Sequence, residues 1–222
     1  MIPRAEPITR LHDTCLARTD WPQSPAAVLP LAADDEHAVW HWITANHRFN
    51  SLLWAEEDLA RRTTVLADEI AANKRAIDRF NQARNDATER VDELLLTLLG
   101  LVDAASARGD APVSTAPPGA RLNSETAGSI IDRLSIMALK VHAMHLQTRR
   151  SDVDAAHVQA SLGKLLRLQQ QRADLGACLD KLLADAQAGR AYFKVYRQFK
   201  MYNDPRFNPA LVAEQATQAA RG

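Results

Sequence analysis

Residues 31–99 form a run of 69 positions without a single glycine or proline. Glycine and proline interrupt helices more strongly than other residues, so this run favours long helices. One helix of this length would span about 100 Å at about 1.5 Å per residue, whereas a compact chain of this size has a radius of gyration of about 17 Å. The run must therefore fold back on itself. We place the break at Thr63-Thr64, where two β-branched residues can end one helix and cap the next.

The rest of the chain also reads as helix. A seam of positions three and four residues apart follows the second predicted helix, as in a helix packed along its length. It consists of Leu66, Ile70, Asn73, Ile77, Phe80, Arg84, Ala87, Val91, Leu94 and Leu98. The predicted helices cover about 34–62, about 65–100, a stretch from Ser124 or Thr126, about 152–188, and 190–202. No segment alternates with period two. The predicted fold class is therefore all-α, a long-helix bundle of about five helices with no sheet.

Composition sets the domain organisation and excludes some functions. Residues 1–30 contain five prolines and are expected to form an irregular leader that can pack on the body, followed by a single helical domain over 31–222 with an exposed loop at 109–123. The 27 basic residues balance the 27 acidic ones, which argues against a nucleic-acid binder. No stretch has the roughly 18 apolar residues of a membrane span or the pattern of a signal peptide. We therefore expect a cytoplasmic location.

Polar side chains occupy positions where a helix core is normally apolar. One line on the first long helix mixes aromatic with polar residues: Trp40, Ile43, His47, Asn50, Trp54, Glu57 and Arg61. On the second, a wholly polar line comprises Lys74, Asp78, Asn81, Asn85, Thr88 and Asp92. Because a buried guanidinium is costly without a partner, Arg84 in the seam requires a carboxylate. Glu57, Asp58 or Asp132 could supply it.

Two interpretations of these polar lines remain open. They can form a buried polar network that sets the register of the helices, or a solvated face. Alternatively, carboxylates, amides and arginines converge on a ligand in a polar cleft between the first two long helices.

Four further features bear on whether the chain has a metal, phosphate or nucleic-acid site. No Glu-x-x-His motif occurs, so no metal site is expected. Glu89-x-x-Asp92 matches half of the magnesium set of all-α nucleotide pyrophosphohydrolases, but adjacent Glu56 and Glu57 replace the other half. The helix start at 123–129 could bind phosphate or could simply be capped by Ser124 or Thr126. The aromatic and basic segment 190–207 could bind single-stranded nucleic acid, although core packing is favoured.

Four ordered stretches resemble a known family. They are HRFNSLLWAEED at 47–58 with Arg61, KRAID at 74–78 leading to NQARND at 81–86, GSIIDRLS at 128–135 with Leu139-Lys140, and FKMYNDP at 199–205 with Asn208-Pro209. Together they resemble the bacterial family called domain of unknown function 4254, over about residues 40–210. The resemblance implies an all-α cytoplasmic protein without an assigned activity. It also implies an association with glycosyltransferases of cell-surface polysaccharide synthesis.

The family motifs also imply candidate site residues, which coincide largely with the polar lines. They are His47, Asn50, Glu57, Asp58, Arg61, Asp78, Asn81, Arg84, Asn85, Asp86, Asp132 and Lys200.

Two functions compete. In the first, the chain is a non-catalytic helical module that binds a partner such as a glycosyltransferase, without a cofactor; its long helices are also compatible with a homodimer. In the alternative, it is an enzyme acting on a sugar-phosphate or nucleotide-sugar in the polar cleft. Glu57 or Asp58 would then be a general base or Mg²⁺ ligand, and Arg61, Arg84 and Lys200 would hold phosphate.

Overall fold

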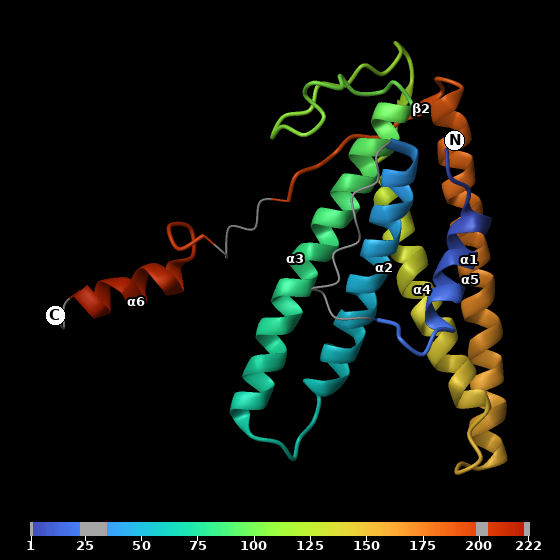
Figure 1. The fold of residues 1–222 in the computed structure, drawn as a ribbon, viewed down its shortest axis with the longest axis vertical. Coiled ribbons are helices and arrows are strands. Elements are labelled where there is room, and N and C mark those ends of the chain that lie inside the picture. Colours follow the sequence, from blue (N-terminus) through green and yellow to red (C-terminus); the bar gives the residue numbers. More distant parts are fainter. Residues whose placement is uncertain (1, 23–34, 199–203, 220–222) are drawn as a thin grey trace.

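The computed structural model describes residues 2–22, 35–198 and 204–219 (Figure 1). The helices in these ranges are α1 (Ala5–Leu16), α2 (Asp35–Leu59), α3 (Ala67–Leu98), α4 (Ala127–Thr148), α5 (Ala155–Gln187) and α6 (Pro209–Ala219). The all-α prediction is confirmed. One detail of it was wrong, because the two-residue strands β1 (Arg121–Leu122) and β2 (Ala191–Tyr192) pair in parallel. None of the described helices is long and apolar enough to cross a membrane.

Two helical hairpins make up the body of the molecule. α2 packs along α3, and the turn between them contains Thr63-Thr64, where the break was predicted. α4 packs along α5 in the same way, and α4 also contacts both helices of the first hairpin. In Figure 1 the hairpins converge at the end near β2 and diverge toward the turns that join their helices.

The hydrophobic core lies at the convergent end. The carboxyl-terminal half of α3 contributes the buried residues Val91, Leu94, Leu95 and Leu96, whereas Leu66 at the start of the predicted seam is 74% exposed. The apolar spacing is the same along the whole helix. It corresponds to core only where α4 covers α3, so the first half of the seam is not a core face.

The prediction of an irregular leader was wrong, because α1 lies within residues 1–30. Ile8 and His12 are fully buried, and the Ala5 amide donates to Asp180 Oδ1 at 2.9 Å. The helix tolerates Pro7 because this residue lies in the first turn, where backbone N–H groups have no intrahelical acceptor.

The prediction of a helix over 190–202 was also wrong for residues 190–198, and residues 199–202 lie outside the described residues. Gly189, at φ +68°, follows the end of α5, and the Arg121 amide then donates to the Arg190 carbonyl at 2.9 Å in the β1–β2 pair. The chain continues without helix to residue 198, and α6 follows later. No other described element packs against α6, and none of its residues is buried.

Candidate functional site

A cavity of about 370 Å³ opens between α2, α3 and α4. We call it the α2–α3 cleft. Its size lies within the range of small-molecule sites, about 300–1,000 Å³. Its apolar walls are Leu53, Trp54, Ile77, Ile136 and Leu139, and its polar lining consists of Asn50, Glu57, Asp58, Arg61, Asn81 and Arg84. All six polar lining residues were candidate site residues, so the structure brings half of that set around one cavity.

Asp132 of α4 lies at the centre of a polar network with Asn46, Asn50 and Arg84. We call this network the floor of the cleft. Its Oδ1 accepts hydrogen bonds from the side-chain amides of Asn46 and Asn50, both at 2.8 Å. Its Oδ2 lies 3.7 Å from Arg84 Nη1. The prediction that Arg84 requires a carboxylate is therefore confirmed, and Asp132 supplies it. The negative charge of Asp132 is shared among these three partners, so the floor is held by α2, α3 and α4 together.

Arg84 remains incompletely hydrogen-bonded after these contacts. Its Nη2 donates to Asn85 Oδ1 at 2.9 Å, and its Nε is buried without a hydrogen-bond partner in the described part of the chain. A guanidinium carries five N–H donors in a fixed fork that matches phosphate and carboxylate groups. Arg84 is thus a partly satisfied cation that faces a cavity.

The acidic candidates lie at the rim. Glu57 accepts from Arg61 Nη1 at 2.9 Å, and both side chains are largely solvated. Asp58, the next residue, also lines the cavity and is exposed. The rim therefore carries two carboxylates and one guanidinium, and the floor carries the buried network.

His47 lies behind the floor and does not line the cavity. Its Nδ1 is 2.8 Å from Ser135 Oγ, and its ring stacks between His12 at 4.4 Å and Trp21 at 5.4 Å. Burial lowers the pKa of His47 to about 3, so the ring is neutral at physiological pH. His47 supports the position of Ser135, which also accepts from Asn50 at 3.0 Å.

Several supporting residues were missed from the sequence. His12 and Trp21 belong to the predicted leader, which was expected only in general terms to pack on the body, and no motif there indicated a contact with α2. Ser135 could have been noticed, because it is a hydroxyl residue on the apolar face of α4 next to the buried Leu134.

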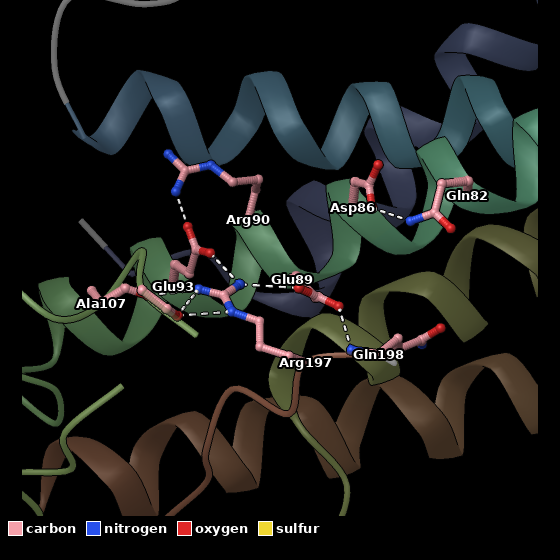
Figure 2. A network of polar contacts seen from close by, with 9 residues as sticks. Gln82, Asp86, Glu89, Arg90, Glu93, Ala107, Arg197 and Gln198 are labelled. Carbon is pink, nitrogen blue, oxygen red and sulfur yellow. Dashed lines mark hydrogen bonds and ion pairs between the residues drawn. The ribbon is translucent and has the colours of Figure 1, made fainter. Parts of the chain in front are cut away.

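The remaining candidate site residues that the structure describes do not line the α2–α3 cleft. Asp78 pairs with Lys74 on an exposed face of α3. Asp86 accepts from Gln82 at 2.6 Å (Figure 2) and does not line the cleft. Asn85 is buried beside Arg84, and Lys200 lies outside the described residues.

Glu89 and Asp92, which match half of the magnesium motif, do not come together as a metal site in the structure. The Asp92 carboxylate accepts from the Gly128 amide at 2.6 Å, and burial raises its pKa to about 7. Glu89 instead contacts Arg197 at 3.0 Å (Figure 2). Within residues 2–22, 35–198 and 204–219, no three His, Cys, Asp or Glu side chains come together as metal ligands. The residues present therefore do not fit a Mg²⁺ site of that type.

The start of α4 is capped by its own side chains. Thr126 and Ser129 form a reciprocal capping box, and the Gly128 amide is bound to Asp92. Because these donors are occupied within the protein, the capping interpretation holds here and the phosphate interpretation does not.

The segment after β2 packs on the body. Phe193 and Val195 are buried, and Arg197 contacts Glu89, Glu93 and the Ala107 carbonyl (Figure 2). Core packing is thus confirmed for Phe193 and Val195 but not for residues 204–207, where Phe207 is 57% exposed, and residues 190–198 are not helical. Tyr196 is 54% exposed.

A family model described as "Protein of unknown function (DUF4254)" matches residues 40–195, a range that includes every residue lining the cleft. No curated protein and no solved structure matches the chain significantly.

Proposed function

The chain belongs to the family DUF4254, whose description assigns no activity, and we propose from the cleft itself that it binds a sugar phosphate or nucleotide-sugar. In this proposal it acts as a non-catalytic accessory module of cell-envelope polysaccharide assembly in the bacterial cytoplasm. The bound molecule lies between α2, α3 and α4.

The observation that carries the proposal is the position of the Arg84 side chain and the contacts that hold it there. Its side chain is 25% exposed, lines the cleft, and is oriented by Asp132 and Asn85. A guanidinium fixed in this way can form charge-assisted hydrogen bonds to a phosphate without first losing side-chain entropy. The neighbouring lining residues suit a sugar: Asn81 offers a side-chain amide for hydroxyl groups, and Trp54 offers an apolar face.

The accessory role is supported by how the polar groups are used. The floor amides and Asp132 are bonded to one another, and Glu57 is bonded to Arg61. Such groups position a ligand, whereas proton transfer requires a group that is free to exchange its proton.

One observation favours the enzyme alternative. Asp58 lines the cleft and no described cation pairs with it, so it is available as a general base. If the chain is an enzyme, Asp58→Asn abolishes turnover of a sugar phosphate while the ligand still binds. If it is an accessory module, the native chain shows binding and no turnover.

The proposed partner is a glycosyltransferase of the same pathway, and the exposed position of α6 supports a partner-binding role. The helix stands apart from the other described elements, and Val212 on it is 46% exposed. Val212→Asp is expected to abolish co-elution with that enzyme in size-exclusion chromatography. Co-elution that survives this substitution would exclude α6 as the contact, and the native chain alone would show whether it forms a homodimer.

Isothermal titration calorimetry with glucose 1-phosphate and UDP-glucose tests the cleft. Arg84→Gln is expected to weaken binding by about 10- to 100-fold, because one charge-assisted contact contributes about 1.5–3 kcal/mol. Arg61→Gln, at the exposed rim, is expected to weaken it less and cannot disturb the fold. Arg75→Gln on the exposed side of α3 is the matched control and should change nothing. The proposal fails if neither compound binds at millimolar concentration, or if all three variants bind like the native chain.

A further inference from the structure

A second cavity, of about 420 Å³, lies on the other side of Trp54. It opens between the end of α2 and the α4–α5 hairpin, and Trp54 is a wall of both cavities. It was not predicted from the sequence, because the residues that form it come from three helices. We call it the α4–α5 pocket.

Two matching helix faces form the α4–α5 pocket. On α4 the lining residues follow one another at spacings of three, one and three, and on α5 the spacing is the same. Such positions lie on one face of a helix. The α4 face consists of Lys140, Ala143, Met144 and Gln147, and the α5 face of Lys164, Arg167, Leu168 and Gln171.

The antiparallel register brings the two lysines to the same height. Gln147 Oε1 lies 3.2 Å from His157 Nε2 near the turn between the helices. Lys140 precedes Gln147 by as many residues as Lys164 follows His157. Because both helices rise by the same distance per residue, Lys140 and Lys164 face each other across the pocket, and Arg167 lies one turn further along α5.

All charged residues that line the α4–α5 pocket are basic. Lys140, Lys164 and Arg167 all line it, its lining includes no acidic residue, and no described carboxylate pairs with any of the three. Most other arginines of the hairpins, such as Arg62, Arg84 and Arg90, have a carboxylate partner. Three convergent cations without an acid raise the local potential and attract an anion.

The other walls of the pocket are apolar. Trp54, Met144 and Leu168 are all partly buried and offer an aromatic face and two flexible or branched aliphatic surfaces. An inorganic ion would leave these surfaces in water, whereas a wholly apolar molecule would leave the three cations unmatched. The pocket therefore complements a molecule with both properties.

We propose that the α4–α5 pocket is a binding site for an amphipathic organic anion, with a phosphate or carboxylate head. The head lies between Lys140, Lys164 and Arg167. The apolar body lies against Trp54, Met144 and Leu168. This site is separate from the α2–α3 cleft and does not depend on the function proposed for it.

Calorimetric titration with n-octyl phosphate, below its micellar concentration, tests the site. Inorganic phosphate supplies the head alone, and n-octyl glucoside supplies the same chain with a neutral head. Octyl phosphate is expected to bind at least about tenfold more tightly than either, because only it satisfies both parts of the pocket. Equal binding of octyl glucoside would overturn the proposal, as would no detectable binding of octyl phosphate at millimolar concentration.

Charge-removing variants locate the binding. Lys140→Gln and Lys164→Gln are each expected to weaken octyl phosphate binding about tenfold. Both side chains are exposed, so the fold should be unaffected. Lys181→Gln is the matched control, because Lys181 lies on the same helix as Lys164, outside the pocket, and pairs with Asp185. A loss of the same size in Lys181→Gln would overturn the proposal.

Two further measurements separate this site from its alternatives. Arg84→Gln should leave octyl phosphate binding unchanged; a loss there would place the molecule in the α2–α3 cleft and refute the α4–α5 pocket. Vesicles containing phosphatidylglycerol distinguish a free anion from a lipid surface. Binding to vesicles without binding of monomeric octyl phosphate would assign the three cations to a membrane surface and refute the proposal.

Discussion

His12 and His47 stack on each other within the core, 4.4 Å apart, and both are fully buried. Burial lowers the pKa of His47 from 6.5 to about 3, and burial likewise lowers that of His12 well below its usual value. Between about pH 6.5 and pH 3 the unfolded chain therefore binds protons that the folded chain does not. The free energy of unfolding therefore has its full value above about pH 6.5, where both histidines are neutral in either state. It decreases as the pH falls through this interval.

The prediction concerns the size of this acid destabilisation. Each histidine contributes at most about 1.4 kcal/mol per pH unit. His12→Phe removes one of them, together with two ring nitrogens that have no hydrogen-bond partner among the described atoms. Urea unfolding at pH 7, 5.5 and 4 should give a shallower decline for this variant than for the native chain. His145→Phe, at an exposed position of α4, should keep the native slope; the same slope in both variants would contradict the assignment.

The contact between α3 and α4 depends on one glycine. A Cβ on Gly128 would lie 2.6 Å from the Thr88 carbonyl oxygen and 2.8 Å from Asp92 Cγ. Helix propensity alone favours alanine over glycine by about 1 kcal/mol, but the carbonyl belongs to the α3 backbone and cannot move without separating the helices. Gly128→Ala is therefore expected to lower the free energy of unfolding by about 1–3 kcal/mol.

Gly163 is the matched control for this substitution. It also lies within a helix, and the nearest atom to a Cβ there would be the flexible end of Arg167 at 3.7 Å. Gly163→Ala should be neutral or stabilising by up to about 1 kcal/mol in the same denaturation experiment. If the two variants change stability in the same direction, the steric argument for Gly128 is wrong.

Local sequence signals predicted where the helices lie, whereas tertiary contacts determine which residues their faces meet. The run without glycine or proline located α2, α3 and the turn at Thr63-Thr64, because helix breaking is a local property. The spacing of Arg84 predicted a carboxylate partner but could not choose among three. Only the approach of α4 selects Asp132.

The errors have the same origin. Segment 190–202 has helical spacing, but at Ala191–Tyr192 the backbone pairs with β1 instead, a strand far away in the sequence. The polar lines indicated a site on α2 and α3, yet the cleft is completed by Ile136 and Leu139 of α4. A one-dimensional pattern identifies which residues share a face and does not identify what that face meets.

At the scale of the whole molecule, Arg197 joins three parts of the chain (Figure 2). Its Nη1 lies 3.0 Å from Glu89 and 2.5 Å from Glu93 on α3, and its Nη2 donates to the carbonyls of Ala107 and Gly109 at 3.0 and 2.9 Å. The segment after β2, the loop after α3 and α3 itself are thereby fixed to one another at the convergent end of the hairpins.

Removal of this guanidinium leaves two carboxylates on α3 without their shared cation. The Glu93 side chain is only 5% exposed, and Arg90 is its remaining partner. Arg197→Gln is expected to lower the free energy of unfolding by about 2–4 kcal/mol, measured by urea denaturation at neutral pH, because an incompletely paired buried charge is costly. Arg197→Lys should recover little of this, since an ammonium cannot reach both carboxylates and both carbonyls as the planar fork does. Arg206→Gln breaks a solvated pair with Asp204 and should leave the free energy of unfolding nearly unchanged. Equal losses at positions 197 and 206 would mean that the network in Figure 2 contributes no more than a surface ion pair.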